Sequence, residues 1–248
     1  MVHFYSILKS MSFFNLPSPI HQLNSAFLQK QEVELWLKRD DLIHEEISGN
    51  KWRKLKYNIA EAEKQGLERI LTFGGAYSNH IAATAAAGKV FGIETVGVIR
   101  GDEGFENKTL QDAKENGMQL HFISRAEYKL KTEERFIQQL KDQFGAFYLI
   151  PEGGANELGV QGCEEIMKEM KQSFDVIAIS AGTGTTAAGV CRKLENENLM
   201  VFPALKGGGF IKDELKQYCS EGQLQNVQLQ LEYHFGGYGK TKPEQLQF

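Results

Sequence analysis

The chain has 248 residues, a formal net charge of −4, and 42% hydrophobic and 24% charged residues. This length is enough for one large domain or two smaller ones with buried cores, and the composition is ordinary for a soluble globular protein. The mild charge predicts no nucleic-acid or membrane partner, and no apolar run is long enough to span a bilayer.

The start of the chain and the cysteines both bear on its compartment. Residues 1–16 are fairly apolar but are interrupted by a lysine and two serines and lack a small-residue cleavage site, so they do not indicate a signal peptide. The odd number of cysteines, with no close pair, fits neither a disulfide framework nor a zinc site. We therefore expect a cytoplasmic protein without a metal. The cysteines are Cys163, Cys191 and Cys219.

The first ordered segment is expected to be a loop followed by a strand. Residues 16–28 contain Pro17 and Pro19, which force extended backbone and predict a loop. Residues 33–39 alternate between apolar and polar side chains and predict a strand that ends at two aspartates. We expect the strand to exit to solvent at the first of these, Asp40, so that its side chain is exposed.

Strands and helices then alternate to the end of the chain. A helix that begins around position 51 ends at Gly66, and a short strand, 69–73, leads into an alanine-rich helix, 78–92. This alternation predicts an α/β fold of open, mostly parallel twisted sheets with helices on both faces. The remaining predicted strands are 95–100, 119–123, 146–150, 175–179, 200–204 and 227–233, and the remaining helices are 107–116, 132–143, 159–171, 186–195 and 212–219.

The segment Ser48–Leu55 contains a lysine in an unusual setting. Lys51 follows a Ser-Gly-Asn turn and opens a helix, where the positive helix end and the basic neighbours disfavour its own charge. An amine that is kept partly neutral can attack a carbonyl and form a Schiff base. Taken alone, however, a basic and solvated first turn is the simpler interpretation.

Two glycine-rich turns follow predicted strands, at residues 72–80 and 180–186. Ligands of parallel α/β sheets bind beyond the carboxyl ends of the strands, where both turns fall. In the second turn, glycines expose backbone N–H groups, a helix N-terminus favours an anion, and threonine hydroxyls add donors. We predict that it holds a phosphate group. The residues of this cradle are Ala181, Gly182, Thr183, Gly184, Thr185 and Thr186.

The same turn also fits a dinucleotide-binding pattern. Residues 182–187 match G-x-G-x-x-G/A after a strand and before a helix. That pattern requires an acidic residue about twenty positions later, where this chain has Leu205 and Lys206. The usual ribose contact is therefore excluded, but a phosphorylated cofactor is not. An NADP-type dehydrogenase remains the second interpretation.

Together and in this order, the Lys51 turn and the two glycine turns resemble the pyridoxal-phosphate enzymes of fold type II. Within that group they resemble the 1-aminocyclopropane-1-carboxylate deaminase and D-cysteine desulfhydrase family. The resemblance extends from about Leu16 to the end of the chain. It implies a large domain of residues 1–53 and 163–248, a small inserted domain of residues 54–162, and pyridoxal phosphate in the cleft between them.

The resemblance also implies roles for single residues. Lys51 holds the cofactor aldehyde and afterwards acts as general base. Asn79 hydrogen-bonds the cofactor ring hydroxyl, and Ser78 contacts the substrate carboxylate or takes part in proton transfer. An ordinary helix cap is the alternative for both of these residues. Tyr77 and His80 are expected beside the substrate, although the family usually has Gln in place of Tyr77.

A further site residue is expected near the end of the chain. Tyr238, in a glycine-rich turn, resembles the first active-site tyrosine of the family, with a surface tyrosine as the alternative. Residues 240–248 resemble a helix that has just begun, whereas relatives continue and carry a partner for the ring nitrogen there. The sequence is therefore expected to lack a C-terminal segment. If this length is natural, a catalytically inactive pyridoxal-phosphate-binding relative is the third interpretation.

The activity implied by the resemblance is deamination of a small amino acid, with release of ammonia and a 2-oxo acid by a homodimer. With D-cysteine as substrate, Lys51 removes the α proton while hydrogen sulfide leaves. With 1-aminocyclopropane-1-carboxylate, which has no α hydrogen, ring opening needs a nucleophile or a proton removed elsewhere. We favour the D-cysteine type, and Tyr77 keeps the choice open.

Overall fold

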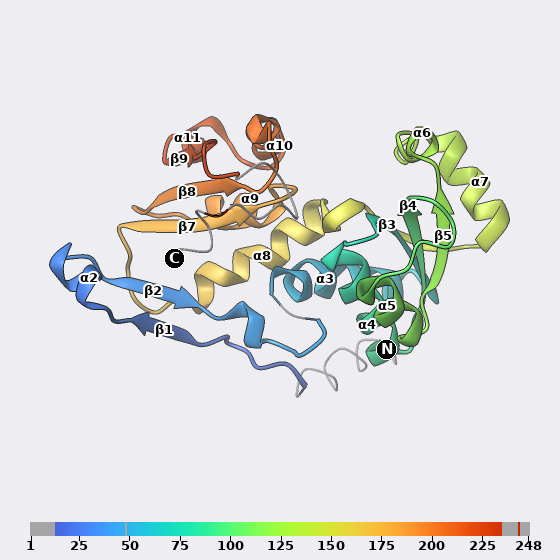
Figure 1. Cartoon of the computed structure of the whole chain (residues 1–248), viewed down its shortest axis with the longest axis horizontal. Helices are drawn as coiled ribbons and strands as arrows, with labels where there is room; N and C mark the ends of the chain where they lie inside the picture. The colour runs from blue at the N-terminus through green and yellow to red at the C-terminus, as the bar shows by residue number, and fades with distance from the viewer. Residues whose placement is uncertain (1–12, 48, 235–242, 244–248) are drawn as a thin grey trace. The chain divides into compact units, whose positions relative to one another are not determined.

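A computed structural model describes residues 13–47, 49–234 and 243 of the chain. The chain forms two compact units, Met1–Gly154 (unit 1) and Ala155–Phe248 (unit 2). The division expected from the family, with residues 54–162 as a separate small domain, remains a prediction. Figure 1 shows the alternation of strands and helices in both units.

The described part of unit 1 is built around a parallel sheet with the strand order β5-β4-β3-β6 (Figure 1). Alternate residues of a strand face opposite sides of a sheet, and β3 uses both of its sides. Ile70 packs with α3 and α4, whereas Leu71 and Phe73 pack with α6 and α7. Helices therefore cover both faces, as predicted. The strands are β3 (Arg69–Gly75), β4 (Glu94–Arg100), β5 (Gln119–Ile123) and β6 (Tyr148–Ile150), and the helices are α3 (Asn50–Lys64), α4 (Asn79–Phe91), α5 (Lys108–Glu115), α6 (Arg125–Tyr128) and α7 (Glu134–Phe144).

An arm precedes the parallel sheet of unit 1. Strands β1 (Ile20–Leu23) and β2 (Leu35–Lys38) pair antiparallel, and α2 (Ala26–Lys30) connects them. The loop predicted for residues 16–28 is therefore wrong from Ile20 onward. The reason is local, because Ser25 caps α2 by accepting a hydrogen bond from Leu28 N, and a five-residue helix leaves little periodicity to detect.

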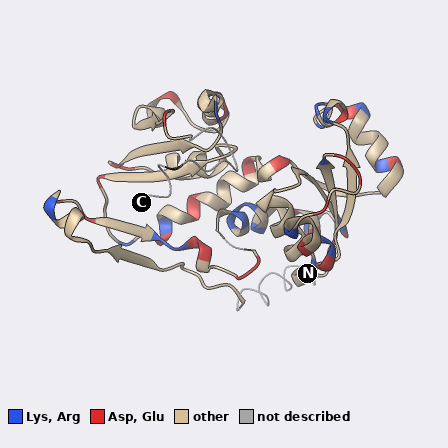
Figure 2. Cartoon of the chain, viewed as in Figure 1, with Lys and Arg blue, Asp and Glu red and all other residues tan. Residues whose placement is uncertain are grey.

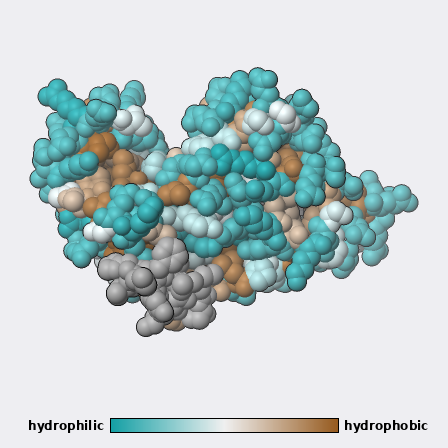
Figure 3. Space-filling model, turned by 180° about the vertical axis from the view of Figure 1, so that it is seen from behind, coloured by the Kyte–Doolittle hydropathy of each residue, from teal (hydrophilic) through white to brown (hydrophobic). Residues whose placement is uncertain are grey.

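The arm contributes little to the core. Several of its large apolar side chains are exposed, and some of this apolar surface is visible in Figure 3. After β2, the short 3₁₀ turn η2 (Asp40–Leu42) leads toward α3. The exposed apolar residues of the arm are Leu23, Phe27, Val33, Leu35 and Leu37.

The described part of unit 2 contains a smaller parallel sheet with the order β7-β8-β9. One apolar core joins β7 and β8 to α8, α9 and α10. Helices α8 and α9 approach closely at Gly189, where an added Cβ would lie 2.5 Å from Cys163 Cβ. The strands of unit 2 are β7 (Val176–Ala181), β8 (Asn198–Pro203) and β9 (Val227–Leu229), and its helices are α8 (Glu157–Glu169), α9 (Thr185–Cys191), α10 (Ile211–Tyr218) and α11 (Glu221–Leu224), with the 3₁₀ turn η4 (Gly208–Phe210). A further 3₁₀ turn, η3 (Glu152–Gly154), lies at the end of unit 1.

The predicted α/β class with parallel sheets is confirmed, and the errors concern element bounds and short elements that were not predicted, such as β1, α2, α6 and α11. The strand predicted for residues 227–233 ends at Leu229, and the helix predicted for residues 186–195 ends at Cys191. In the described part of the chain, no helix combines the length and apolarity that a membrane crossing requires. Basic and acidic side chains are interspersed in both units (Figure 2).

Candidate functional site

Lys51 lies in the first turn of α3, at a helix start without a side-chain cap. The N-cap residue Gly49 has φ 63° and ψ −151°, a backbone region that glycine adopts readily and other residues do not. Its N–H donates to the backbone oxygen of Asp40 over 2.8 Å. Lys51 is half-buried, and as the second residue of α3 it lies within the uncapped first turn, at the positive end of the helix. Ser48 lies outside the described residues.

Asp40 does not exit to solvent, and that prediction is wrong. Its carboxylate accepts two hydrogen bonds of 2.6 Å from the guanidinium of Arg53, which is fully buried. Ser18 Oγ donates a third, also of 2.6 Å, to the same carboxylate. Arg53 is two residues from Lys51, so this pair fixes the turn of α3 that carries the lysine. The sequence offered only a Lys-Arg-Asp-Asp run before the lysine turn, without a sign of the partner thirteen residues later.

Lys54 lies one turn beyond Lys51 on a neighbouring face of α3. Its side chain is buried, and its amine donates to the backbone oxygen of Gly153 over 3.2 Å. Gly153 and Gly154 both have left-handed backbone, with φ of 69° and 70°. A Cβ on Gly154 would lie 3.0 Å from Lys54 Cβ and 3.5 Å from His80 Cε1. These glycines therefore let the loop after β6 approach α3 and α4.

His80 is a buried histidine, 2% exposed, whose tautomer is fixed by its neighbours. Thr72 Oγ1 donates to the backbone oxygen of Ile150 over 2.8 Å and lies 3.0 Å from His80 Nε2. The hydroxyl has one proton, so it accepts from Nε2–H and leaves Nδ1 as an acceptor. Nδ1 is buried and has no hydrogen-bond partner within the described residues. Burial, then the charges of Lys51 and Lys54, lower the pKa of His80 well below its ordinary value, so the ring is neutral.

The glycines of the first predicted turn, Gly74 and Gly75, are the last two residues of β3, so the strand extends beyond its predicted end at residue 73. The turn itself follows Gly75 and leads into the N-cap of α4. Ser78 is the N-cap, and its Oγ accepts from the backbone N–H of Ile81 over 3.3 Å. The ordinary cap is therefore present, and a substrate role of the same hydroxyl is compatible with it. Gly74 is required by packing alone, because a Cβ there would lie 2.4 Å from Ile81 Cγ1.

Two further predicted residues of this turn are exposed. Asn79 is the first residue of α4, and its exposure leaves it accessible to a ligand. Tyr77 is 61% exposed, and its ring lies edge-on to Phe105 with centroids 5.9 Å apart. Both residues belong to the carboxyl edge of the unit 1 sheet, where the predicted substrate turn should lie.

The predicted phosphate cradle, Ala181–Thr186, lies where β7 ends and α9 begins. Gly184 is the N-cap of α9, with φ 78° and without a side-chain cap. The hydroxyl oxygens of Thr183 and Thr185 are 3.0 Å apart and form a hydrogen bond. A Cβ on Gly182 would meet nothing within 4 Å, and its φ is outside the left-handed region. None of the described residues therefore requires glycine at position 182, whereas a ligand that approaches the backbone would.

These observations test whether pyridoxal phosphate fits the chain. Unit 1 supplies an amine, Lys51, close to a neutral and buried acceptor, His80 Nδ1. Unit 2 supplies a turn that is open above Gly182 and ends at an uncapped helix start. Both features suit the aldehyde and phosphate ends of the cofactor. Each unit contains its part of the predicted site, and Tyr238 lies outside the described residues.

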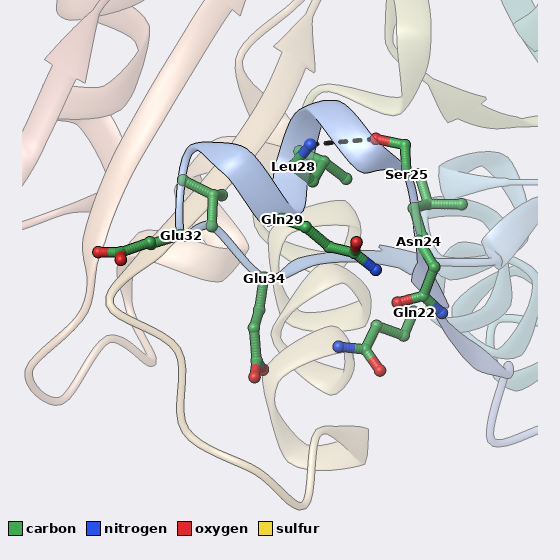
Figure 4. A pocket seen from close by; sticks show the side chains of 9 residues that line it. Gln22, Asn24, Ser25, Leu28, Gln29, Glu32 and Glu34 are labelled. Carbon is green, nitrogen blue, oxygen red and sulfur yellow. Dashed lines mark hydrogen bonds between the residues drawn. The ribbon is translucent and has the colours of Figure 1, made fainter.

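A hollow on the arm does not fit the same ligand. It has a volume of about 330 Å³ and is lined by amide, carboxylate and apolar side chains between β1, α2 and β2 (Figure 4). It contains no lysine that could hold an aldehyde, and it carries two carboxylates, Glu32 and Glu34, that would repel a phosphate. The arm is therefore not the candidate site.

Residues 11–206 of the chain match the model of the family described as pyridoxal-phosphate dependent enzyme. A bifunctional D-cysteine desulfhydrase/1-aminocyclopropane-1-carboxylate deaminase, mitochondrial, of Arabidopsis thaliana is 34% identical over 201 residues, which cover 73% of this chain and 50% of the relative. The chain thus spans about half the length of that relative. A D-cysteine desulfhydrase of Salmonella typhimurium is 28% identical, with 79% of this chain and 63% of the relative covered.

A solved structure is also similar to the whole chain. It is described as a crystal structure of the ACC deaminase homologue, and it has a TM-score of 0.78 and 28% sequence identity. The match covers 100% of this chain and 81% of the solved one. The arrangement of strands and helices described above is therefore shared with a protein of that kind.

Proposed function

Because the chain belongs to the family of pyridoxal-phosphate-dependent enzymes, we propose that it is a deaminating lyase of small amino acids in which Lys51 holds the cofactor. The family predicted from the three motifs is confirmed by the match over residues 11–206, and so is its cofactor. The dinucleotide interpretation of residues 182–187 loses its basis, because this turn lies inside the matched region. The observation that carries the proposal is Lys51 at an uncapped helix start beside neutral His80.

The chain's own residues divide the work of binding and proton transfer. The backbone N–H groups of residues 181–186 and the threonine hydroxyls hold the phosphate. Ser78 and the N–H groups at the start of α4 bind the substrate carboxylate, and Asn79 contacts the cofactor ring. When bound, pyridoxal phosphate supplies the electron sink for the charge that develops at the substrate α carbon. Tyr238 is proposed as a further contact of the ring.

Lys51 is the proposed base. In its neutral form, the Lys51 amine would remove the proton from the α carbon of the substrate. His80, kept neutral by burial and by Lys51 and Lys54, adds no positive charge that would repel the ammonium form of Lys51. Overall, D-cysteine and water give pyruvate, ammonia and hydrogen sulfide. We favour D-cysteine over 1-aminocyclopropane-1-carboxylate because its elimination needs only this one base.

An assay of the purified protein with both substrates tests the proposal. We expect sulfide from D-cysteine at a higher kcat/KM than 2-oxobutanoate from 1-aminocyclopropane-1-carboxylate, and loss of both activities in Lys51→Ala. Borohydride reduction followed by mass spectrometry should place the cofactor on the Lys51 peptide. A protein that binds pyridoxal phosphate at Lys51 but converts neither substrate would overturn the lyase and leave the inactive binding relative.

The oligomeric state and the cellular compartment are also part of the proposal. We infer a homodimer from the family resemblance, which sedimentation equilibrium tests directly. Three free and buried cysteines support a reducing compartment such as the cytoplasm. The small domain of residues 54–162 is likewise part of the proposal, and limited proteolysis near its borders tests it.

A further inference from the structure

A buried ion pair lies behind the turn that carries Lys51. Arg53 Nε and Nη2 each donate to one oxygen of the Asp40 carboxylate over 2.6 Å. The Arg53 side chain is 1% exposed and that of Asp40 16%. Ser18 Oγ donates to Asp40 Oδ1, and Lys38 donates to the backbone oxygen of Ser18 over 2.8 Å. The pair therefore joins the β1 side of the arm, the turn η2 and helix α3.

Stability alone does not account for such a pair. Removing two charges from water costs several kcal/mol per ion, and well-packed apolar residues of similar volume are often equally stabilising or better. What a buried, bidentate pair supplies is a single geometry, because the planar guanidinium and the carboxylate match in one orientation only. The Asp40–Arg53 pair is thus suited to fixing the position of α3 rather than to strengthening the fold.

The geometry connects this pair to Lys51. Residues 51 and 53 are about 200° apart around a helix, so Arg53 anchors the side of α3 opposite to the lysine. Asp40 also contacts the start of α3 through its backbone, because its carbonyl oxygen accepts a hydrogen bond from the N–H of Gly49 over 2.8 Å. Asp40 therefore binds both the N-cap residue Gly49 and the first turn of α3. Neither contact involves Lys51 or Lys54, whose charges act on His80 and lower its pKa.

We propose that Asp40 and Arg53 are positioning residues for Lys51, which set the placement of its amine without touching cofactor or substrate. This inference rests on the proposed function, in which Lys51 holds the cofactor. Reaction rates depend steeply on such placement, because a displacement of about 1 Å can cost roughly a hundredfold.

The chain offers a matched control one residue away. Arg39 and Asp41 form a bidentate pair of the same kind, with Arg39 Nε 2.9 Å from Asp41 Oδ1 and Nη2 2.7 Å from Oδ2. These side chains are 29% and 57% exposed and make an ion pair between close neighbours in sequence. Replacing this pair removes one arginine and one aspartate on either side of Asp40, as in the test variant, without breaking a contact of α3.

The test compares the wild type with two double variants, Asp40→Leu/Arg53→Met and the control Arg39→Met/Asp41→Leu. Three quantities are measured: Tm, the rate at which added pyridoxal phosphate becomes fixed on Lys51 by borohydride, and the acetylation rate of Lys51 in cofactor-free protein. Lys64, at the exposed far end of α3, is the internal standard for acetylation.

For Asp40→Leu/Arg53→Met we expect a Tm within about 4 °C of the wild type. Cofactor capture should nevertheless slow at least about tenfold, and Lys51 acetylation should change relative to Lys64. The control should match the wild type in all three quantities. Unchanged capture and acetylation in the folded Asp40→Leu/Arg53→Met variant would overturn the proposal.

Two further results keep the test decisive. If the apolar variant fails to fold, Arg53→Lys retains the charge and loses the bidentate geometry, and it should capture the cofactor more slowly than the wild type. Unchanged capture in folded Arg53→Lys would count against positioning. A wild type that captures no cofactor at Lys51 would instead refute the proposed function, and the acetylation of Lys51 would still report whether the pair places its amine.

Discussion

Helices α8 and α9 lie in the same unit, but their N-termini are satisfied in different ways. At the start of α8, Asn156 caps the helix, with Oδ1 accepting from Gly159 N over 2.8 Å. At the start of α9, Gly184 provides no side chain, and the hydroxyls of Thr183 and Thr185 bond each other. A helix start that is closed by its own side chain serves the fold, whereas one left open offers its N–H groups to an anion.

The starts of α3 and α4 extend this comparison to unit 1. Helix α3 begins at Gly49 without a side-chain cap, as α9 does, and it carries Lys51. Helix α4 is capped by Ser78, as α8 is capped by Asn156, and it places His80 in a buried environment. Among the described α-helices, the starts at Gly49 and Gly184 combine a positive φ with no side-chain cap and coincide with the two strongest parts of the candidate site, whereas the 3₁₀ turn η4 begins at Gly207 in the same way outside it.

Four predictions test this difference, in order of decreasing effect on the free energy of unfolding. Gly184→Ala should have the largest effect. Its φ of 78° costs a residue with a side chain about 1–2 kcal/mol, and the new Cβ would lie 3.3 Å from Glu214 Cβ. We expect a loss of about 2 kcal/mol in urea unfolding and weaker binding of pyridoxal phosphate in a spectroscopic titration. Full stability with full affinity would show that the open start of α9 has no special requirement.

The second prediction concerns the pH dependence that His80 contributes. The folded ring stays neutral because its pKa is lowered, whereas the unfolded histidine takes up a proton near its ordinary pKa of about 6.5. The stability from neutral His80 is thus complete above that pH and is lost as the pH falls below it, by up to about 1.4 kcal/mol per pH unit. Unfolding free energies of the wild type and His80→Gln between pH 8 and 5 measure the difference. Parallel pH profiles of the two proteins would contradict this contribution of His80 to stability.

Part of this arrangement could be predicted from sequence because it is local. Lys51 follows a Gly-Asn turn, Ser78 precedes a helix, and Gly182–Thr186 follow a strand, so each helix start is visible in a few adjacent letters. The parallel sheets follow from the same regular alternation, and β5 was predicted with its observed bounds, Gln119–Ile123.

The parts that could not be predicted depend on contacts between distant residues. Asp40 and Arg53 are thirteen residues apart, and neither letter indicates that the other will be buried with it. Thr72 fixes the tautomer of His80 only because the Thr72 hydroxyl already donates its hydrogen bond to the carbonyl oxygen of Ile150. Helix α2 was missed for another reason, since its burial pattern carries no apolar face toward the core.

The third prediction addresses the closed helix start. Asn156→Ala should destabilise the protein by about 1 kcal/mol, because Gly159 N–H loses its acceptor, and Asn156→Ser should restore most of this loss. The affinity for pyridoxal phosphate should stay the same in both variants. Thermal unfolding and cofactor titration measure the two effects separately. A clear loss of affinity in Asn156→Ala would mean that capped helix starts also take part in the site.

The fourth prediction has the smallest effect on unfolding, and it distinguishes most clearly between a ligand contact and a distorted turn. Gly182→Ala places a methyl group where no protein atom lies within 4 Å and where φ is not left-handed, so unfolding should change by less than about 0.5 kcal/mol. If this turn holds the cofactor phosphate, the same methyl group occupies the space that the phosphate needs, and affinity should fall about tenfold, or about 1.4 kcal/mol. Gly184→Ala weakens binding and stability together, so it cannot separate a ligand contact from a distorted turn. A change at position 182 that reduces affinity while stability stays constant would support a ligand that approaches the backbone, because no described residue lies within 4 Å of the added methyl group. Equal affinity in Gly182→Ala would remove the phosphate from this turn.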